Sequence, residues 1–298
     1  MYYLFYGILY LISLLPFWVL YIISDGFYIL VYHLIKYRRT MVMSNLKKAF
    51  PEKTELERIV IAKQFYHHFI DTFIETIKLI SLSETSLTKR YKVNIDEINA
   101  LYDSGQNLVI VSAHYFNWEF ANAGTGMVIK YPLVTAYIPI KNKAFDKIIY
   151  DLRTRFKNTF LIKATNFRNE FYPYMKQRYA LGLVADQKPG APDQAYWVRF
   201  FGQLMPFVKG PEKISKGNNN AVAYLHFYPV KRGYYNLDYQ VVTTEPKTLP
   251  EGTLTQKLAD ITEECIRKRP AAYLWSHNRW KYEFDEEKYG KLVVKETT

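Results

Sequence analysis

The stretch LVIVSAHYFNWE, residues 108–119, decides the fold. Its first part, 108–113, is a short continuous run of apolar and β-branched side chains, which is typical of a strand buried on both faces. Similar apolar runs recur at 133–138, 160–164, 180–185 and 221–230. Segments with helical spacing separate the first four runs, at 117–130, 143–157 and 167–178. This alternation predicts an α/β fold with a mostly parallel or mixed central sheet flanked by helices.

Further elements surround this core on both sides. After Lys231-Arg232-Gly233, the side chains of residues 234–244 alternate in the pattern of a strand, which predicts an antiparallel hairpin. Residues 254–268 have the spacing of a final helix. Upstream, helical patterns cover 41–50 and 54–80. Within the 298 residues we find no repeat and no internal linker. We therefore expect an N-terminal segment 1–35 and one domain 36–298, made of a helical lead-in 36–107 and an α/β core 108–298.

The N-terminal segment is predicted to anchor the chain in a membrane. Residues 2–24 carry no formal charge, and about 20 apolar residues suffice to span a bilayer. The segment lacks the basic start and small-residue cleavage site of a cleaved signal peptide. Because Pro16 and Asp25-Gly26 interrupt the run, the anchor is either a transmembrane helix or a helix in the interface. A buried core helix is the other interpretation.

Charge supports the membrane interpretation. Basic residues follow the apolar segment, which predicts a cytoplasmic location for the rest of the chain: Lys36, Arg38, Arg39, Lys47 and Lys48. The net charge is +12, which favours an anionic partner. A hydrophobic N-terminus with a cationic cluster beside it fits an anionic lipid surface better than nucleic acid. With the single cysteine Cys265, and without zinc-peptidase, P-loop or dinucleotide motifs, we expect no metal and no cofactor.

Polar residues follow the strand at 108–113. Ligands of open α/β sheets sit at the carboxyl ends of the strands, where His114 lies. Asn117 is placed to cap the next helix, with Glu119 in its first turn. A carboxylate there can accept a proton from one imidazole nitrogen, which leaves the other as a general base. The alternative is a structural histidine, but its position at a strand end favours a catalytic pair.

The residues from Ser112 to Glu119 resemble the His-x4-Asp/Glu motif of the bacterial lipid A biosynthesis acyltransferase family, in the lysophospholipid acyltransferase superfamily. Three more segments resemble that family in the same order. They are Arg38-Arg39 with Asn45-Leu46 and 49–52, then Ala185-Asp186-Gln187 with RFFG at 199–202, and finally RPAAYLWSHNRWK at 269–281. The resemblance extends from residue 2 to about residue 281.

This resemblance implies acyl transfer from an acyl carrier protein thioester to a hydroxyl of a lipid A precursor or related glycolipid. His114 would be the general base and Glu119 its orienting partner, without a covalent acyl-enzyme. The acyl carrier protein would serve as co-substrate. The implied location is the bacterial inner membrane, with the catalytic domain on the cytoplasmic side. An alcohol attacks a thioester readily only when a base takes its proton, so the residue chemistry agrees.

The resemblance also suggests substrate-binding residues, among them Asn117. Arg168 matches an arginine of the family placed to meet an acceptor phosphate or to help hold the His114–Glu119 pair; the alternative is a surface arginine paired with Glu170. Asp186 and Gln187 end the fourth strand and either orient the acceptor or cap a turn. Four basic residues on another connection and its helix are expected at the rim, to meet the acidic carrier: Lys141, Lys143, Lys147 and Arg153.

Three departures concern acceptor recognition. Lys188 stands where the family usually has an acidic residue, Arg199 replaces a proline, and Ala271-Ala272 replaces Glu-Gln. An acyltransferase for another lipid, such as an aminolipid or lysophospholipid, is therefore the alternative. A non-catalytic lipid-binding protein on this fold is the second alternative, against which the intact His114 and Glu119 argue. Acyl chain length, acceptor hydroxyl and oligomeric state are not specified by the sequence.

Overall fold

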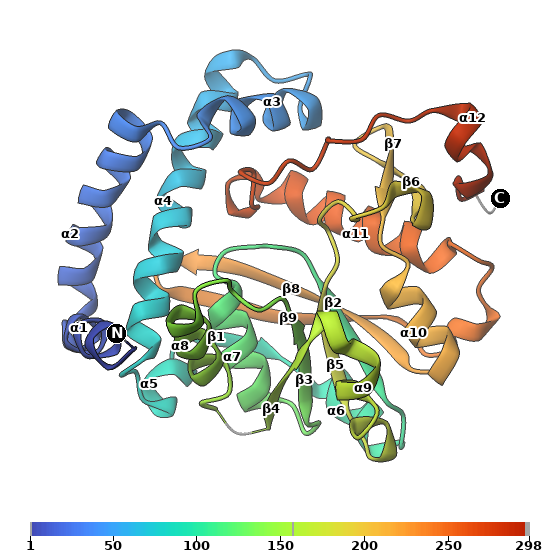
Figure 1. The fold of residues 1–298 in the computed structure, drawn as a ribbon, viewed down its shortest axis with the longest axis horizontal. Coiled ribbons are helices and arrows are strands. Elements are labelled where there is room, and N and C mark those ends of the chain that lie inside the picture. Colours follow the sequence, from blue (N-terminus) through green and yellow to red (C-terminus); the bar gives the residue numbers. More distant parts are fainter. Residues whose placement is uncertain (1, 157, 296–298) are drawn as a thin grey trace.

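The computed structural model describes residues 2–156 and 158–295. A seven-stranded sheet runs through its centre in the order β1-β9-β8-β2-β5-β3-β4 (Figure 1). Its strands are β1 Tyr91–Asn94, β2 Leu108–Ser112, β3 Leu133–Tyr137, β4 Thr159–Lys163, β5 Ala180–Val184, β8 Ala221–Lys231 and β9 Tyr234–Thr243. Neighbouring strands are parallel except in the β8–β9 hairpin. The expected α/β fold with a mostly parallel sheet is confirmed.

Helices cover both faces of the sheet, which explains why the central strand β2 is apolar and buried at its first four positions. In β2, Val109 and Val111 face one hydrophobic core, whereas Leu108 and Ile110 face the other. The first core is closed by α11 Thr253–Lys268, with α10 Gly210–Asn218 beside it. The second core is closed by α6 Asp96–Asp103, α7 Trp118–Val128 and α8 Lys143–Arg153.

Some elements differ from the sequence-based expectation. The helix expected at 167–178 is shorter: α9 spans Phe167–Phe171, and Pro173, which lacks an N–H, separates it from a 3-10 turn at Tyr174–Lys176. The expected helical lead-in 36–107 also contributes β1, whose four residues are too few for a clear period. The hairpin of β6 Tyr196–Phe200 and β7 Gln203–Phe207 was not expected either.

The N-terminal segment forms two helices rather than one. α1 spans Tyr2–Leu14, and α2 spans Phe17–Tyr28 and continues as a π-helix over Ile29–Ile35. Pro16 lies at the break, as its missing N–H predicts, whereas Asp25-Gly26 lies inside α2. The 19 residues from Phe17 to Ile35 are long and apolar enough to cross a membrane, and 17% of the most apolar window is buried. This exposure does not fit a buried core helix.

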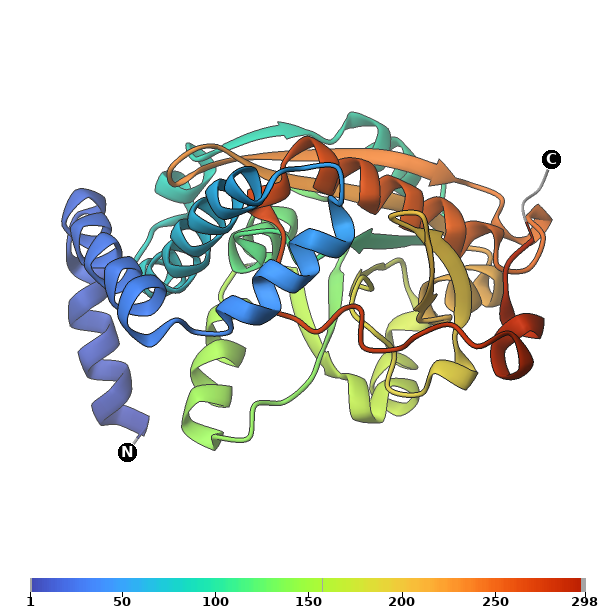
Figure 2. The ribbon, with the colours of Figure 1, turned by 90° about the horizontal axis from the view of Figure 1, so that it is seen from above.

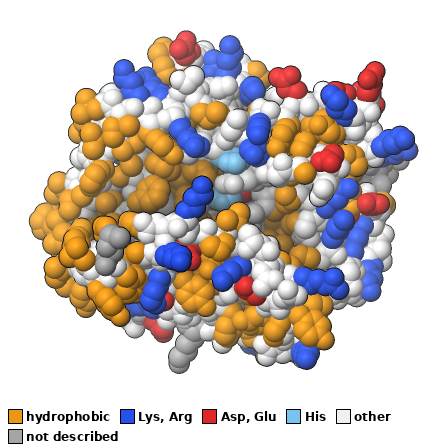
Figure 3. Space-filling model, in the orientation of Figure 1, with side chains coloured by type: hydrophobic (Ala, Val, Ile, Leu, Met, Phe, Trp, Pro, Cys, Tyr) orange, Lys and Arg blue, Asp and Glu red, His pale blue; other side chains and the backbone are white. Residues whose placement is uncertain are grey.

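Two helices join the N-terminal segment to the sheet. They are α3 Arg39–Ala49 and α4 Glu55–Leu79, which begins with a capping box between Thr54 and Glu57. α4 packs along α2 and also contacts α7, next to the sheet. The side of the molecule where α1 and α2 lie in Figure 1 is mainly hydrophobic in Figure 3.

Candidate active site

His114 and Asp186 form a hydrogen-bonded pair at the carboxyl edge of the sheet. β2 and β5 are parallel neighbours in register from Leu108 opposite Ala180 to Ser112 opposite Val184. Both strands therefore end at the same edge, and each is followed two residues later by one member of the pair. Nδ1 of His114 lies 2.7 Å from Oδ1 of Asp186, which also accepts the backbone N–H of His114 at 3.1 Å.

The surroundings of the pair suit a general base. The side chain of Asp186 is 2% exposed and that of His114 is 24% exposed. Burial raises the pKa of Asp186, but the charge and hydrogen bond of His114 outweigh it and leave that pKa below its ordinary value. With the Nδ1 proton directed at the carboxylate, Nε2 keeps its lone pair, and the amide nitrogen of Gln187 lies 3.2 Å from it. Nε2 is thus the ring nitrogen that can take a proton, once a substrate hydroxyl replaces the Gln187 amide as its donor.

The expected contact between Glu119 and His114 is not formed among the described residues. Asn117 does cap α7, since its Oδ1 accepts the N–H groups of Glu119 at 3.0 Å and Phe120 at 3.3 Å. The carboxylate of Glu119, however, accepts two hydrogen bonds from Arg153 of α8, at 2.6 and 2.8 Å. The reason is the guanidinium fork, which matches both carboxylate oxygens at once. Asp186 takes the position on His114 that the sequence suggested for Glu119.

Arg153 is therefore not the peripheral residue that the sequence suggested. Its side chain is 22% exposed and faces a nearly buried partner. Burial lowers its pKa, but the hydrogen bonds and charge of Glu119 prevail and raise it. Of the other rim residues, Lys147 pairs with Asp151 at 2.8 Å, and Lys141 and Lys143 are exposed.

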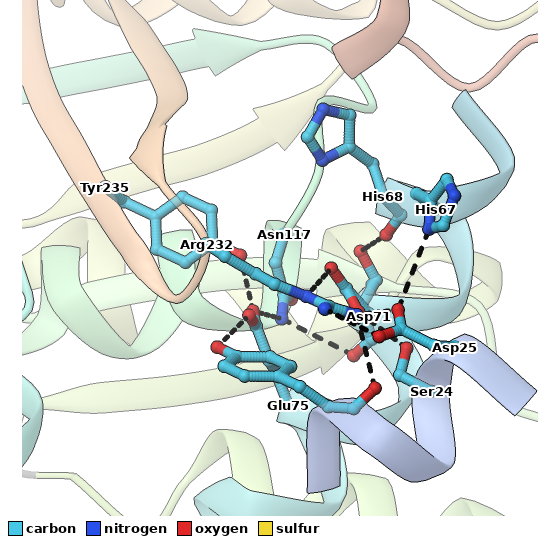
Figure 4. A network of polar contacts seen from close by, with 11 residues as sticks. Ser24, Asp25, His67, His68, Asp71, Glu75, Asn117, Arg232 and Tyr235 are labelled. Carbon is cyan, nitrogen blue, oxygen red and sulfur yellow. Dashed lines mark hydrogen bonds and ion pairs between the residues drawn. The ribbon is translucent and has the colours of Figure 1, made fainter. Parts of the chain in front are cut away.

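The cap residue Asn117 connects this segment to the N-terminal helices (Figure 4). Its Nδ2 donates to the buried carboxylate of Glu75 in α4 at 3.2 Å, and Tyr21 of α2 donates to the same carboxylate at 2.9 Å. The hydroxyl of Tyr235 in β9 is its third donor. Burial raises the pKa of Glu75 to about 7, against the effect of these hydrogen bonds. Sequence reasoning missed Glu75, because only the fold brings α2, α4 and β9 to Asn117.

A second set of charges lies one turn earlier on α4 (Figure 4). Arg232, at the tip of the β8–β9 hairpin, donates to Asp71 of α4 at 2.7 and 2.8 Å. It also donates to Asp25 of α2 at 2.7 and 3.2 Å, and Ser24 donates to Asp71 at 2.5 Å. The hairpin tip thus holds α2 against α4.

The C-terminal stretch 269–281 lies against the His114 segment. The N–H of Leu274 donates to the carbonyl of His114 at 3.1 Å, and that of Phe116 donates to Ala272 at 2.9 Å. Asn45 of α3 donates to two carbonyl oxygens of the same stretch, each at 2.7 Å. The juxtamembrane and C-terminal motifs therefore support the loop that carries His114.

His277, in this stretch, was not among the expected site residues. Burial lowers its pKa to about 4, although the charge of Asp186 acts in the opposite direction. The ring is consequently neutral at neutral pH, and its Nε2 is buried without a hydrogen-bond partner in the described part of the chain. The histidine of the terminal motif was the signal that could have identified it.

An apolar cavity lies beside the pair, between α7 and the sheet. It includes Ser112 and Ala113, which directly precede His114, and reaches Leu133 and Thr135 on β3. Its volume is about 80 Å³, which is well below that of ordinary ligand pockets. The other lining residues are Ile110, Tyr115, Trp118, Ala121, Asn122, Thr125, Gly182, Leu183, Val184, Leu225 and Phe227. The lining is mainly apolar, and Ser112 and Ala113 place the cavity next to His114 in the chain.

Arg168 is exposed on α9, the helix that follows the edge strand β4 in the chain. Three strand spacings separate β4 from β2, which is roughly 14 Å. The arginine thus shares the sheet edge with His114 without reaching it. The middle of the face in Figure 3 is hollowed, with histidine in the hollow and Lys and Arg around its rim. Within residues 2–156 and 158–295, no cluster of three or more His, Cys, Asp or Glu could hold a metal ion.

Residues 1–282 match the family model described as bacterial lipid A biosynthesis acyltransferase. The chain belongs to this family. It is 22% identical over 278 residues to the lipid A biosynthesis palmitoleoyltransferase of Escherichia coli (strain K12), covering 92% of this chain and 89% of that protein. It is also 22% identical over 280 residues to the lipid A biosynthesis lauroyltransferase of that organism, with the same coverage. A lipid A biosynthesis acyltransferase of Haemophilus influenzae is 22% identical over 249 residues, covering 82% of this chain and 76% of that protein.

Membership in the lipid A biosynthesis acyltransferase family makes this chain an acyltransferase and implies an acyl donor and a lipid acceptor. The matched residues include α1 and α2, the His114 segment and the whole C-terminal motif at 269–281. In this acyltransferase two of the three departures from the family pattern lie beside the His114–Asp186 pair. Lys188 directly follows Gln187, and Ala272 bonds to the His114 segment through its backbone. The third, Arg199, lies on β6, where its backbone bonds to Gln256 of α11.

Proposed function

We propose that this protein transfers a fatty acyl chain from an acyl carrier protein thioester to a hydroxyl of a lipid A precursor or related glycolipid. The observation that carries the proposal is the His114–Asp186 pair, 2.7 Å apart beside an apolar cavity, in a chain of this acyltransferase family. The family supports the reaction class and the lipid A pathway. The pair supplies a base, and the apolar lining of the cavity beside it suits contact with hydrocarbon.

In the proposed reaction, Nε2 of His114 takes the proton of the acceptor hydroxyl as its oxygen attacks the thioester carbonyl carbon. The tetrahedral intermediate collapses, the C–S bond breaks, and the imidazolium returns the proton to the leaving thiolate. Asp186 orients the ring and stabilises its positive charge. Glu119 shapes the site by binding Arg153 rather than by touching His114. Asn117 caps α7, the amide of Gln187 lies beside Nε2 of His114, and the ester product forms without an acyl-enzyme.

The proposed acceptor is anionic, and its charge is expected to meet the rim of the site. Arg168, exposed at this edge of the sheet, is proposed to bind an acceptor phosphate, for which its planar fork is suited. The proposed location is the bacterial inner membrane, with residues 1–35 as the anchor and the catalytic domain on the cytoplasmic side. The basic residues that follow the anchor support this orientation.

The test compares three variants of the purified full-length protein with an acyl carrier thioester and a lipid A precursor. His114→Ala should lower kcat by about two to four orders of magnitude, the usual contribution of a general base. Asp186→Asn should lose a comparable factor, and the double variant little more, because the two residues act as a unit. Glu119→Gln removes the negative charge that pairs with Arg153. This variant should lose stability more than kcat.

The rates of these variants and the identity of the acylated product distinguish the alternatives. Normal turnover by His114→Ala would contradict the mechanism. If Glu119→Gln matches His114→Ala while Asp186→Asn stays active, Glu119 and not Asp186 is the orienting partner. Acylation of an aminolipid or lysophospholipid in preference to the lipid A precursor would change the acceptor and leave the chemistry intact.

A further inference from the structure

The loop between β3 and α8 exposes apolar side chains at the same edge of the sheet as His114. Ile138 is 76% exposed, Ile140 is 44% exposed, and Phe145 in the first turn of α8 is 42% exposed. The loop follows the carboxyl end of β3, roughly 10 Å from β2 by strand spacing. Large apolar side chains that are exposed together mark surfaces that bind a protein, a ligand or a membrane.

The loop holds these side chains in a defined arrangement. Asn142 caps α8 by accepting the N–H groups of Ala144 at 3.0 Å and Phe145 at 3.2 Å. Asp146 accepts the N–H of Ile140 at 2.8 Å. The exposure of Ile140 and Phe145 is therefore built into a hydrogen-bonded turn.

This loop is continuous with the exposed apolar surface of α1. The rings of Phe5 and Phe145 lie 5.8 Å apart, and Tyr2 donates to Asp151 of α8 at 2.9 Å. Figure 2 shows α1 and α8 side by side, reaching away from the sheet toward the same side of the molecule. On α1, Leu4 and Leu11 are each 67% exposed. Among the described helices, the next one, Phe17–Ile35, is the one both long and apolar enough to cross a bilayer.

Charge identifies the kind of surface that fits. Lys141 and Lys143 flank the apolar residues, are exposed, and make no ion pair within the described ranges. Lysines beside inserted apolar side chains complement anionic lipid headgroups. A protein carrier would meet the same charge, but it would not explain the continuity with α1.

We propose that Ile138, Ile140 and Phe145, with Lys141 and Lys143, form a second membrane-contact element that enters the interface of an anionic bilayer beside α1. The contact holds the carboxyl edge of the sheet, with His114, toward the lipid phase. It deepens the proposed function and rests on it, because it places the base where a lipid acceptor arrives.

The first experiment measures membrane contact without any acyl transfer. Because Cys265 is the chain's one cysteine, a Cys265→Ser background allows single labels with an environment-sensitive fluorophore. Labels go on Ile140→Cys, on Leu11→Cys as the positive control, and on Ser104→Cys, exposed at the opposite edge of the sheet, as the negative control. The full chain is placed in phosphatidylcholine–phosphatidylglycerol vesicles containing a lipid with a spin label on its acyl chain.

We expect quenching at positions 140 and 11 and none at position 104. Quenching at 11 alone would overturn the second contact. Quenching at neither 11 nor 140 would overturn the anchor together with the loop. A His114→Ala protein should be quenched as the wild type is, so a failure of the proposed chemistry does not alter this result.

The second experiment separates lipid from protein as the partner of the lysines. Lys141→Gln/Lys143→Gln should raise the KM for the lipid acceptor several-fold in anionic vesicles, with kcat unchanged and little effect in neutral detergent micelles. Lys247→Gln/Lys257→Gln, which removes two exposed charges elsewhere, is the matched control. It should change neither the KM for the lipid acceptor nor the KM for the acyl carrier donor. A raised KM for the acyl carrier donor instead would assign the lysines to a protein and overturn their membrane role.

Discussion

Two buried carboxylates, Asp186 and Glu75, contact the segment from His114 to Asn117, and their surroundings give them opposite ionisation. Asp186 faces the ring of His114, which holds its pKa below the ordinary value in spite of burial. Glu75 has only neutral donors, from Tyr21, Asn117 and Tyr235, and burial raises its pKa to about 7. One carboxylate therefore stays charged beside the base, whereas the other gains a proton near neutral pH.

Glu75→Gln should make stability less dependent on pH. The pKa of Glu75 rises from an ordinary value of 4.5 to about 7 on folding, so the folded state binds the extra proton. Its contribution to stability is full below the unfolded pKa and is lost as the pH rises through the folded pKa. The Tm of the wild type should therefore fall relative to that of Glu75→Gln between about pH 5 and pH 8. Thermal unfolding in detergent measures this, and parallel curves would contradict the assignment.

At the scale of elements, α2 is an integral part of the packing as well as a candidate membrane helix. Leu20 is fully buried against α4 with Ile70 and Ile74. Tyr21, Ser24 and Asp25 partner Glu75, Asp71 and Arg232. One face of α2 is therefore bound to the domain, and the opposite face is left apolar and exposed.

Removal of residues 1–35 should cost more stability than removal of residues 1–16. The longer deletion uncovers Ile70 and Ile74 and takes Ser24 and Asp25 from Asp71 and Arg232; the shorter one leaves these contacts intact. Loss of partners from buried charges is among the larger destabilising changes known. In detergent, the Tm of the longer deletion should lie at least roughly 5 °C below that of the shorter one, since about 1 kcal/mol shifts Tm by 2–4 °C at this size. Equal melting temperatures would show that α2 is dispensable for the fold.

At the scale of the whole molecule, the apolar surface and the cationic surface are expected to have different roles at a membrane. The net charge is +12, and Lys and Arg surround the hollow in the face shown in Figure 3. Apolar side chains gather on the side of α1 and α2 in the same view. Apolar contact would hold the protein to the bilayer, and the charge would draw anionic substrates to the site.

Salt should therefore weaken substrate association without slowing the chemical step. Surface charges are screened beyond about 10 Å at 0.1 M ionic strength, whereas the buried His114–Asp186 pair is screened far less. As ionic strength rises from about 0.05 to 0.3 M, the KM for the acceptor in anionic vesicles should increase while kcat stays nearly constant. The same titration in phosphatidylcholine vesicles is the control and should show a smaller change. A fall in kcat with constant KM would contradict this division.

The sequence by itself determined the elements of the fold. Apolar runs at 108–113, 133–138, 160–164 and 180–185 are strands with bounds within one residue of those observed. A strand buried on both faces must be apolar at every position, so a short run identifies it locally. Asn117 capped α7 as its position predicts, and the family resemblance carried by the four motifs is confirmed by the match over residues 1–282. The four-residue β1 and the β6–β7 hairpin were not predicted, because such short strands show little periodicity in the sequence.

Only the tertiary structure decided which residues meet. Glu119 is five residues from His114 yet binds Arg153, whereas Asp186, 72 residues away, binds the imidazole. Sequence distance favoured the near carboxylate. β5 lies beside β2, however, and that pairing brings Asp186 to Nδ1. Glu75 reaches Asn117 in the same way, through the packing of α4. Motifs specify which side chains are present, but the pairing of distant strands and helices sets their partners, because hydrogen bonds act only over about 3 Å.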